Sequence, residues 1–183
     1  MIIAATGHRP EKVGGYGEIP LARLQELARG YMRKMQPAQV ISGMALGWDT
    51  AWALTALELK VPLIAAVPFR DQESRWPLKS RELYRAILEQ AERVEIVCEG
   101  DYMPWKMQKR NEWMCDHADR VCALWNGSPG GTANCIRYAK SIGKSIDNLW
   151  EHYNVSAPDV DNGRESTSTS ERITKLDSIS RLD

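Results

Sequence analysis

The chain has 183 residues, and its 24 Lys and Arg residues balance its 24 Asp and Glu residues. This length suits one domain with a substantial core and is too short for two, and the balanced charge provides no general attraction to nucleic acids or anionic membranes. No apolar run is long enough to span a bilayer, and MIIAATGHRP lacks the basic start and long apolar core of a signal peptide. We therefore expect a cytoplasmic protein without a membrane partner, and we do not expect nucleic acid as a partner.

From the N-terminus onward, short apolar runs typical of β-strands alternate with helical patterns. The apolar runs predict strands at 2–6, 39–43, 62–68, 93–98 and 120–125, with a last edge strand at 144–149. Helices are predicted from about residue 18, with an apolar face continuing to residue 35, and at 47–60, 81–91, 105–117 and 132–142. This alternation predicts a mostly parallel sheet covered by helices on both faces, which is a three-layer α/β sandwich.

The composition changes after residue 153, so we place one domain at 1–153. Residues 154–170 are polar and predict a flexible linker. Four apolar residues of the last segment, 171–183, recur at every third position: Ile173, Leu176, Ile179 and Leu182. With a capping box formed by Ser168 and Glu171, they predict a short amphipathic helix that docks on this protein or on a partner. The alternative is a frayed tail, because so short a helix is marginal alone.

The cysteines and histidines do not form a recognisable ligand pattern. The sequence places them at Cys98, Cys115, Cys122 and Cys135, and at His8, His117 and His152. None of the cysteines has a close partner in the sequence, so we expect reduced, buried thiols and no metal site. No residue pattern requires a cofactor.

The loops that follow the predicted strands share one edge of a parallel sheet, which is where such sheets bind ligands. In the last of these loops, SPGGT at 128–132, Gly130 and Gly131 leave room for a close backbone approach before a helix begins at Thr132. Exposed amides at a helix start attract phosphate. We therefore take Asn126, Gly130, Gly131 and Thr132 as candidate phosphate-binding residues. An ordinary tight turn is the alternative.

The segment ISGMALGWDTAWA, residues 41–53, forms a second glycine-marked junction between a strand and a helix. Ser42 and Gly43 end the predicted strand, Gly47 opens the turn, and Asp49 stands at the start of the helix. We take Ser42, Gly43 and Gly47 as candidate ligand-binding residues. Asp49 could cap that helix, as such residues commonly do. It could instead hold a ribose hydroxyl or act on the reacting sugar carbon.

The segment TGHRP, residues 6–10, follows the first predicted strand and contributes Thr6, Gly7, His8 and Arg9 to the same edge. Arg9 is a fixed cation suited to phosphate or carboxylate, and His8 could bind a ligand or transfer a proton near neutral pH. A surface turn held by Arg9 is the alternative. Because three such junctions meet at one edge, a phosphate-bearing ligand is the better explanation.

The fourth predicted helix and several tryptophans could extend this site. The start of that helix places four residues within reach of a bound phosphate: Lys106, Lys109, Arg110 and Asn111. Asp116 and His117 lie roughly 10–15 Å further along the helix and are discounted as catalytic groups. Four tryptophans lie in or beside the strand-end loops, at Trp48, Trp76, Trp105 and Trp125. They could fill the core or stack on a nucleotide base.

Three segments together resemble the SLOG superfamily of Rossmann-like proteins, and most closely its YpsA-type branch. They are TGHRP, SGMALGWDTAWA, and RNEWMCDHADRVCALWNGSPGGTANCIRYA, in this order. The second is also similar to a signature of the DNA-processing protein of DNA uptake, and the third to the PGG-GT loop of the cytokinin-activating LOG enzymes. The resemblance covers about residues 1–148. It implies a Rossmann-like fold that binds nucleotides or nucleotide-derived ligands, and for LOG enzymes it implies hydrolysis of the bond between a base and ribose 5′-phosphate.

The sequence departs from the LOG pattern where that chemistry needs carboxylates. Asn134 and Cys135 stand where LOG loops carry glutamates, and neither can replace a carboxylate as acid or base. A catalyst would need another carboxylate, for which Asp49 is the first candidate, followed by Glu73 or Asp71.

Three functions therefore stay open. The first is a sensor or processing protein that binds a nucleotide or nucleotide-derived phosphate ligand. The second is a phosphoribohydrolase that cleaves the N-glycosidic bond of nucleoside 5′-monophosphates, and the third is a DNA-binding accessory protein. The zero net charge counts against the third. A homo-oligomer is expected from the resemblance and the terminal apolar stripe.

Overall fold

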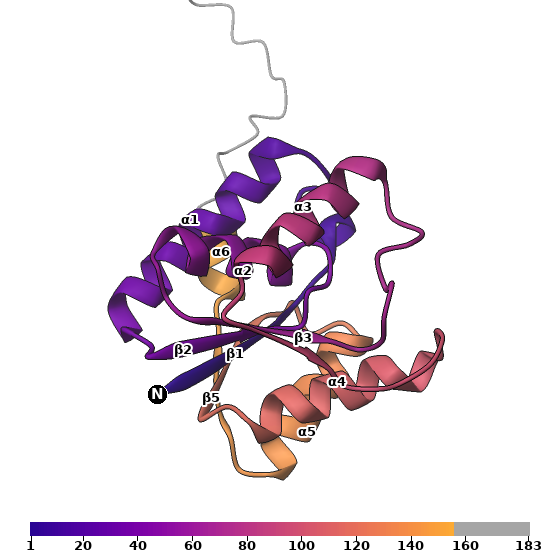
Figure 1. Cartoon of the computed structure of the whole chain (residues 1–183). Coiled ribbons are helices and arrows are strands. Elements are labelled where there is room, and N and C mark those ends of the chain that lie inside the picture. Colours follow the sequence, from indigo (N-terminus) through magenta and orange to yellow (C-terminus); the bar gives the residue numbers. More distant parts are fainter. Residues whose placement is uncertain (156–183) are drawn as a thin grey trace, which may run out of the picture.

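The computed structural model describes residues 1–155. It contains one six-stranded sheet in the order β4-β3-β2-β1-β5-β6, with every neighbouring pair parallel (Figure 1). The strands are β1 (Ile2–Gly7), β2 (Gln39–Ser42), β3 (Leu63–Val67), β4 (Arg93–Ile96), β5 (Arg120–Leu124) and β6 (Ser145–Asn148). The predicted α/β class and parallel sheet are confirmed.

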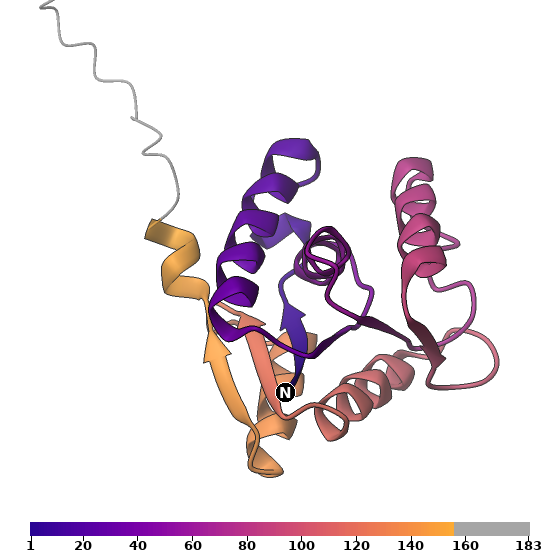
Figure 2. The same cartoon turned by 60° about the vertical axis from the view of Figure 1, so that its left-hand side comes forward.

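Helices cover both faces of the sheet, as Figures 1 and 2 show. One face carries α1 (Glu18–Met35), α2 (Trp48–Glu58) and α3 (Leu78–Gln90), and the other carries α4 (Pro104–Asp116) and α5 (Gly131–Ser141). Successive residues of a strand point to opposite faces. Accordingly, Ile3 and Ala5 of β1 pack into the core beneath α1 and α2, whereas Ala4 packs with Met114 of α4.

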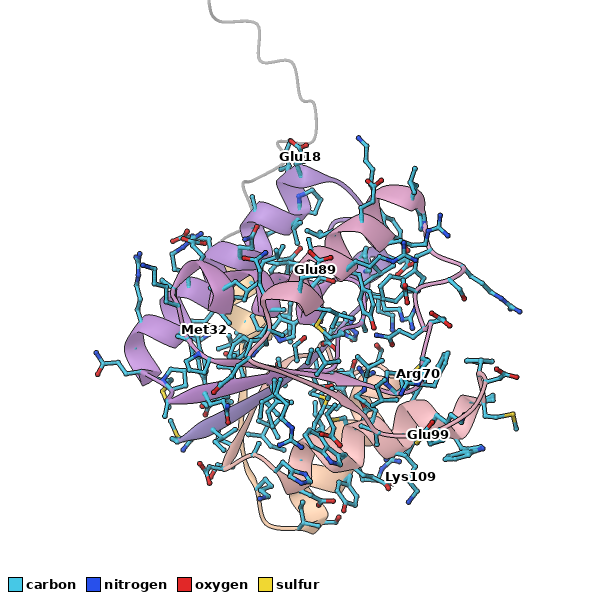
Figure 3. The ribbon with its side chains drawn as sticks, in the orientation of Figure 1. Glu18, Met32, Arg70, Glu89, Glu99 and Lys109 are labelled. Carbon is cyan, nitrogen blue, oxygen red and sulfur yellow. The ribbon has the colours of Figure 1, made fainter. Side chains whose placement is uncertain are left out.

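The helix α2 is apolar nearly all round because it is buried between its neighbours and the sheet. Trp48 and Trp52 are fully buried there, with their ring centroids 5.7 Å apart. Charged side chains such as Glu18, Glu89 and Lys109 lie instead at the periphery of the molecule (Figure 3). None of the helices in the described part of the chain is long and apolar enough to cross a membrane.

Two short elements were not predicted. A 3₁₀ turn, η1 (Pro10–Lys12), follows β1, and a short helix, α6 (Trp150–Val155), follows β6 and packs beside α1. The helix α6 includes residues 154 and 155, which the sequence analysis assigned to the start of the linker. The remainder of that linker and the helix predicted at 171–183 lie outside the described residues.

The predicted burial of the cysteines is confirmed for three of the four. All four thiols are free; Cys115, Cys122 and Cys135 are buried and Cys98 is half-buried.

Candidate functional site

A cavity of about 310 Å³ lies beyond the carboxyl ends of β1 and β5. These two strands are neighbours in the sheet although they are far apart in the sequence, so the chain reverses its direction of winding between them. Such switch points open a crevice at the carboxyl edge of a doubly wound sheet. The cavity is lined by Thr6, Gly7, His8, Arg9, Glu11, Lys12, Ala45, Asp49, Met107, Arg110, Asn111, Ser128, Pro129, Gly130, Gly131 and Thr132.

The glycine-rich loop forms one wall of this cavity. The helix α5 begins at Gly131, and no side chain caps its first amides. An added Cβ on Gly130 or Gly131 would meet nothing within 4 Å, so the space above both residues is open. The first N–H groups of a helix lack intrahelical partners and carry its positive dipole end. This wall is therefore suited to an anion.

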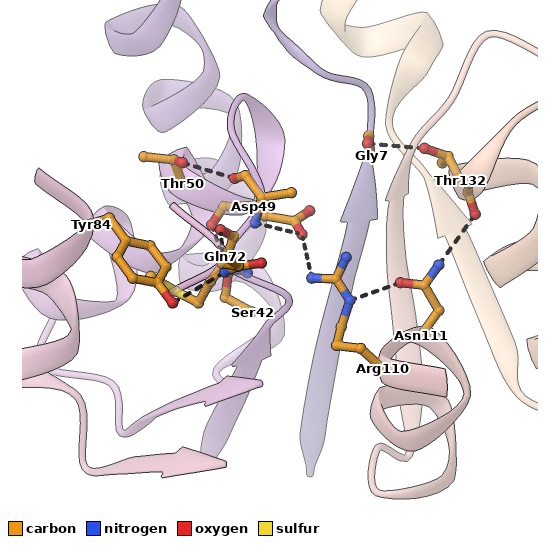
Figure 4. A network of polar contacts seen from close by, with 12 residues as sticks. Gly7, Ser42, Asp49, Thr50, Gln72, Tyr84, Arg110, Asn111 and Thr132 are labelled. Atoms are coloured by element: carbon orange, nitrogen blue, oxygen red, sulfur yellow. Dashed lines mark hydrogen bonds and ion pairs between the residues drawn. The ribbon is translucent and has the colours of Figure 1, made fainter. Parts of the chain in front are cut away.

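Two hydrogen bonds hold the loop against the rest of the site (Figure 4). The Thr132 hydroxyl donates to the Gly7 carbonyl oxygen at 2.9 Å, which ties α5 to the end of β1. The Asn111 amide donates to the Gly131 carbonyl oxygen at 3.4 Å, which ties α5 to α4. The open amides are thus fixed in place by neighbouring elements.

A buried ion pair forms the floor of the site. Arg110 Nη1 of α4 lies 3.7 Å from Asp49 Oδ2 of α2, and each side chain is only 7% exposed. Arg110 Nε donates to Asn111 Oδ1 at 3.0 Å, and Figure 4 shows the guanidinium between Asp49 and Asn111. Neither terminal nitrogen of Arg110 makes a hydrogen bond within residues 1–155, and Nη1 is completely covered. Buried polar groups normally have partners, so Arg110, which also lines the cavity, has hydrogen-bonding capacity that residues 1–155 do not use.

Gly43 makes this pair possible. A Cβ at position 43 would lie 2.1 Å from Arg110 Nη1 and 2.8 Å from Asp49 Oδ2. No side chain larger than hydrogen fits there without moving the guanidinium. Gly43, which follows β2, thus leaves room for the Arg110 side chain, whereas the sequence analysis took it as a candidate ligand-binding residue.

Asp49 does not cap α2. The N-cap position is Gly47, and no side chain caps this helix. The Asp49 carboxylate instead accepts a 3.4 Å hydrogen bond from the Ala45 amide, and the Ser42 hydroxyl donates to the Asp49 carbonyl oxygen at 2.8 Å. These bonds turn the carboxylate toward Arg110 and the cavity.

Burial raises the pKa of Asp49 from its ordinary 3.8 to about 6, against the lowering effects of Arg110, the Ala45 amide and Arg9. Burial also lowers the pKa of Arg110, which Asp49 partly offsets. At neutral pH, Asp49 is mostly ionised but close to its pKa. A carboxylate in this state can accept a proton from a bound hydroxyl or water.

The segment after β1 supplies a second group of polar side chains. His8 Nε2 lies 2.7 Å from Asn126 Oδ1, and burial is the main cause that lowers the pKa of His8 below 6.5. Arg9 is exposed, and its side chain makes no hydrogen bond or ion pair within the described chain. Lys12 Nζ donates to Ser128 Oγ at 2.6 Å, which links η1 to the glycine-rich loop.

The structure brings together most of the predicted site residues. Ten of them line the cavity: Thr6, Gly7, His8, Arg9, Asp49, Arg110, Asn111, Gly130, Gly131 and Thr132. Four others support it from behind: Ser42 and Gly43 pack against the ion pair, Gly47 approaches the His8 carbonyl oxygen, and Asn126 holds the His8 ring. Their roles in binding stay predictions.

Four predicted contributors lie elsewhere. Glu73 is buried outside the cavity and accepts a hydrogen bond from Arg85 at 3.3 Å, while Asp71 is exposed and does not line the cavity. Lys109 pairs with Glu112 on the outer side of α4, and the buried Lys106 donates to the carbonyl oxygens of Glu99 and Asp101.

The proposed stacking of tryptophan on a base is not supported by the positions of the indole rings. None of the four candidate tryptophans lines the cavity. Trp48 is in the core, Trp76 packs on Tyr84, and Trp125 donates to the Ser128 carbonyl oxygen at 2.7 Å. Trp105 is 52% exposed at the start of α4.

Sequence reasoning missed several residues of the wall. The polar ones are Glu11, Lys12 and Ser128, and the apolar ones are Ala45, Met107 and Pro129. Glu11 and Lys12 lie in the loop after β1, so the rule that strand-end loops share one edge could have included them. Met107 precedes Arg110 by one helical turn, and only its place on α4 brings it to the cavity.

Comparison with known proteins finds a matching family and several similar sequences. A family model described as the YspA SLOG family matches residues 4–149. The chain is 34% identical over 152 residues to the uncharacterized SPbeta prophage-derived protein YoqJ of Bacillus subtilis strain 168, which covers 73% of this chain and 86% of YoqJ. It is 30% identical over 143 residues to a UPF0398 protein of Bacillus pumilus, covering 72% of this chain and 76% of that protein.

Two solved structures share the fold. DNA processing protein A from Helicobacter pylori, described for its single-stranded DNA binding mode, aligns with a TM-score of 0.57 at 22% identity. That alignment covers 80% of this chain and 63% of the Helicobacter chain. The structural-genomics target TM1055 aligns with a TM-score of 0.53 at 17% identity, covering 79% of this chain and 71% of the other. At these identities the likeness concerns the fold alone.

Proposed function

The chain belongs to the YspA SLOG family, and from this premise we propose that its cavity at the β1–β5 switch point binds a nucleotide or nucleotide-derived phosphate ligand, as a sensor or processing protein. One observation carries the proposal. The residue Arg110, whose Nη1 has no hydrogen-bond partner in residues 1–155, lines the same cavity as the uncapped amides of α5. Fixed cations and helix-start amides are the groups that recognise phosphate.

The size and lining of the cavity support a ligand of nucleotide dimensions. A volume of about 310 Å³ is near the lower end of the range for small-molecule sites. The phosphate would lie against Gly130, Gly131 and the exposed Arg9, while the Asp49 carboxylate would accept a hydrogen bond from a sugar hydroxyl. Since no indole lines the cavity, the base would make few stacking contacts.

A thermal unfolding assay tests this proposal. Nucleoside mono- and diphosphates and ADP-ribose are added in turn, and a ligand that binds the folded chain raises Tm. Arg9→Ala removes an exposed cation without a partner, so it should leave Tm of the free protein unchanged and reduce the ligand-induced rise. Arg33→Ala, on the exposed last turn of α1, is the control. If no nucleotide shifts Tm, or if both variants behave alike, the proposal is wrong.

A second candidate activity is a phosphoribohydrolase that cleaves the N-glycosidic bond of nucleoside 5′-monophosphates. It is favoured by one observation, the buried carboxylate of Asp49 facing the cavity with its pKa raised to about 6. Such a group could activate water, which would add to the sugar carbon while the base departs with the bond electrons and takes a proton. Chromatography of incubated nucleoside monophosphates should then detect free base, and Asp49→Asn should abolish its release. Loss of release in Glu73→Gln instead would assign the chemistry to the other predicted carboxylate.

A DNA-binding accessory role is the third candidate. The similarity of fold to the Helicobacter DNA processing protein favours testing it, although the net charge of this chain is zero. Fluorescence anisotropy of a labelled single-stranded oligonucleotide at physiological salt measures such binding directly. Native mass spectrometry of the purified protein would report a retained nucleotide and the expected homo-oligomer in one measurement.

A further inference from the structure

A second cavity, of about 990 Å³, lies between α1, β6 and α6. Figure 2 shows these three elements side by side at the β6 edge of the sheet. The floor of this groove includes five largely apolar side chains: Leu27, Tyr31, Met35, Leu149 and Tyr153. Five charged side chains also line the groove: Arg23, Glu26, Lys34, Arg120 and Asp147. Because β6 is the last strand of the sheet, the groove is bounded by a strand edge that no other described strand covers.

At Gly30, the α1 wall of the groove has no side chain. This residue lies in the interior of α1, where glycine weakens a helix relative to alanine. An added Cβ would meet nothing within 4 Å, so the packing among residues 1–155 does not require glycine here. A missing side chain at an open, apolar position is suited to the close approach of another segment.

The chain itself supplies an occupant of matching chemistry. The helix α6 ends at Val155, and its residues His152 and Tyr153 already line the groove, so the following segment starts beside it. Residues 156–170 are polar, and the sequence predicts a linker there, for which this length gives a root-mean-square span of roughly 20 Å, comparable with the length of α1. Tethering at this distance gives an effective concentration in the millimolar range.

We propose that the apolar stripe of segment 171–183, formed by Ile173, Leu176, Ile179 and Leu182, docks in the groove between α1, β6 and α6 of its own chain. The stripe provides four apolar side chains at regular spacing, and the groove provides an apolar floor with an open glycine. Docking would bury the apolar side chains of the stripe against those of the groove. Without docking, both surfaces would stay open to water, and a short isolated helix would be marginally stable.

Limited trypsin digestion of the full chain tests this docking. The linker contains Arg164 and the docked segment contains Lys175. Cleavage at Lys175 requires release of the segment, whereas Arg164 stays accessible and serves as an internal reference. Since cleavage follows the released fraction, we expect Lys175 to be cut about tenfold more slowly than Arg164 in the wild-type chain.

Two variants should remove this protection, one by changing the groove and the other by changing the stripe. Gly30→Trp fills the groove from a position where an added Cβ meets nothing within 4 Å. Ile179→Ser with Leu182→Ser removes half of the stripe without changing residues next to Lys175. Each should bring the rate at Lys175 close to that at Arg164. The matched control, Ser178→Thr with Ser180→Thr, changes positions outside the stripe and should retain protection.

The same digestion distinguishes the possible occupants. Protection that is unchanged on dilution supports docking within one chain, and protection that disappears on dilution shows that a second copy fills the groove, which overturns the proposal. Equal cleavage at Arg164 and Lys175 in the wild-type chain also overturns it. If Gly30→Trp fails to fold, the stripe variant still decides, because its changes lie outside the domain.

Discussion

At the level of single residues, the candidate site depends on the buried pair of Asp49 and Arg110, whose charged atoms are 3.7 Å apart. Transfer of two charges from water into the interior is costly, and loss of one partner leaves the other uncompensated. The pair therefore has to be held by its surroundings. Ser42 and Ala45 fix Asp49, and Asn111 fixes Arg110.

Asp49 should make the free energy of unfolding depend on pH in a recognisable way. Between pH 3.8 and about 6, the folded chain keeps a proton on Asp49 that the unfolded chain has released. The stability from this group is therefore complete below pH 3.8 and is lost as pH rises to about 6. The free energy of unfolding falls by about 3 kcal/mol across this range. The Asp49→Asn variant has no titrating carboxyl at this position and cannot show this fall.

Urea unfolding of both proteins from about pH 4 to about pH 7 measures this effect. The stability of the wild-type chain relative to Asp49→Asn should fall across the window, whatever constant offset the loss of the ion pair adds. Parallel pH profiles of the two proteins would contradict the raised pKa.

Gly43 should be intolerant of even one added methyl group. Gly43→Ala places a Cβ 2.1 Å from Arg110 Nη1, so the guanidinium must move away from Asp49. We expect a loss of about 1–3 kcal/mol in the free energy of unfolding, as for other overpacked interior sites. Gly131→Ala is the comparison, because its Cβ meets nothing within 4 Å, and its stability should change by less than about 0.5 kcal/mol. Equal losses would show that close packing at Gly43 is unimportant.

Residue types at strand ends allowed part of the site to be predicted. Gly130, Gly131 and Arg9 were chosen because glycines before a helix leave its first amides open and arginine is a fixed cation, both in loops at the strand-end edge of the sheet. The pairing of Asp49 with Arg110 could not be predicted, because it depends on how α4 packs across the sheet from α2. The role of Gly43 follows from that packing and was equally hidden.

At the level of elements, the strands and helices predicted within residues 1–155 are present, because their apolar residues recur with the period of a strand or a helix. In α1, Leu24, Ala28 and Tyr31 of the predicted face are buried. The missed elements, η1 and α6, have three and six residues, too few to show a helical period. The helix α6 depends on tertiary contacts instead: Tyr153 is buried against Arg23, and Trp150 packs edge-on against His8 at 5.5 Å.

Lys106 should be the residue that fixes the loop before α4. It is 3% exposed, and its ammonium donates to the backbone oxygens of Glu99 and Asp101. Lys106→Met retains most of the side-chain volume but leaves both carbonyl oxygens unpaired, so we expect a loss of about 2–3 kcal/mol and faster hydrogen exchange in residues 97–103. The control is Lys109→Met, whose exposed ion pair with Glu112 contributes little to stability. Similar losses in both variants would refute the anchoring role.

At the level of the whole molecule, the location of the cavity follows from strand order. The alternation of strands and helices predicted a parallel sheet, but the same alternation is compatible with several strand orders. The order β4-β3-β2-β1-β5-β6 puts the loops after β1 and β5 side by side. Arg9 reaches the glycine-rich loop because β1 and β5 are neighbours. The alternation of elements predicted that the two loops share an edge of the sheet, but it did not predict that they are adjacent there.

A ligand bound at the switch point should therefore stabilise loops from both halves of the sheet together. With the nucleotide that raises Tm most, present at about 100 times Kd, the bound state gains about 2.7 kcal/mol, so exchange through local opening should slow by up to about 100-fold. Hydrogen exchange should slow in residues 6–12, 43–49 and 126–133, which meet at the cavity, and should not change in β6 or α6, which line the separate groove. A molecule held by Arg9, Arg110 and the α5 amides contacts segments on both sides of the point where the sheet reverses its winding. Slowing of exchange in only one of these loops would therefore mean that the ligand does not bridge β1 and β5.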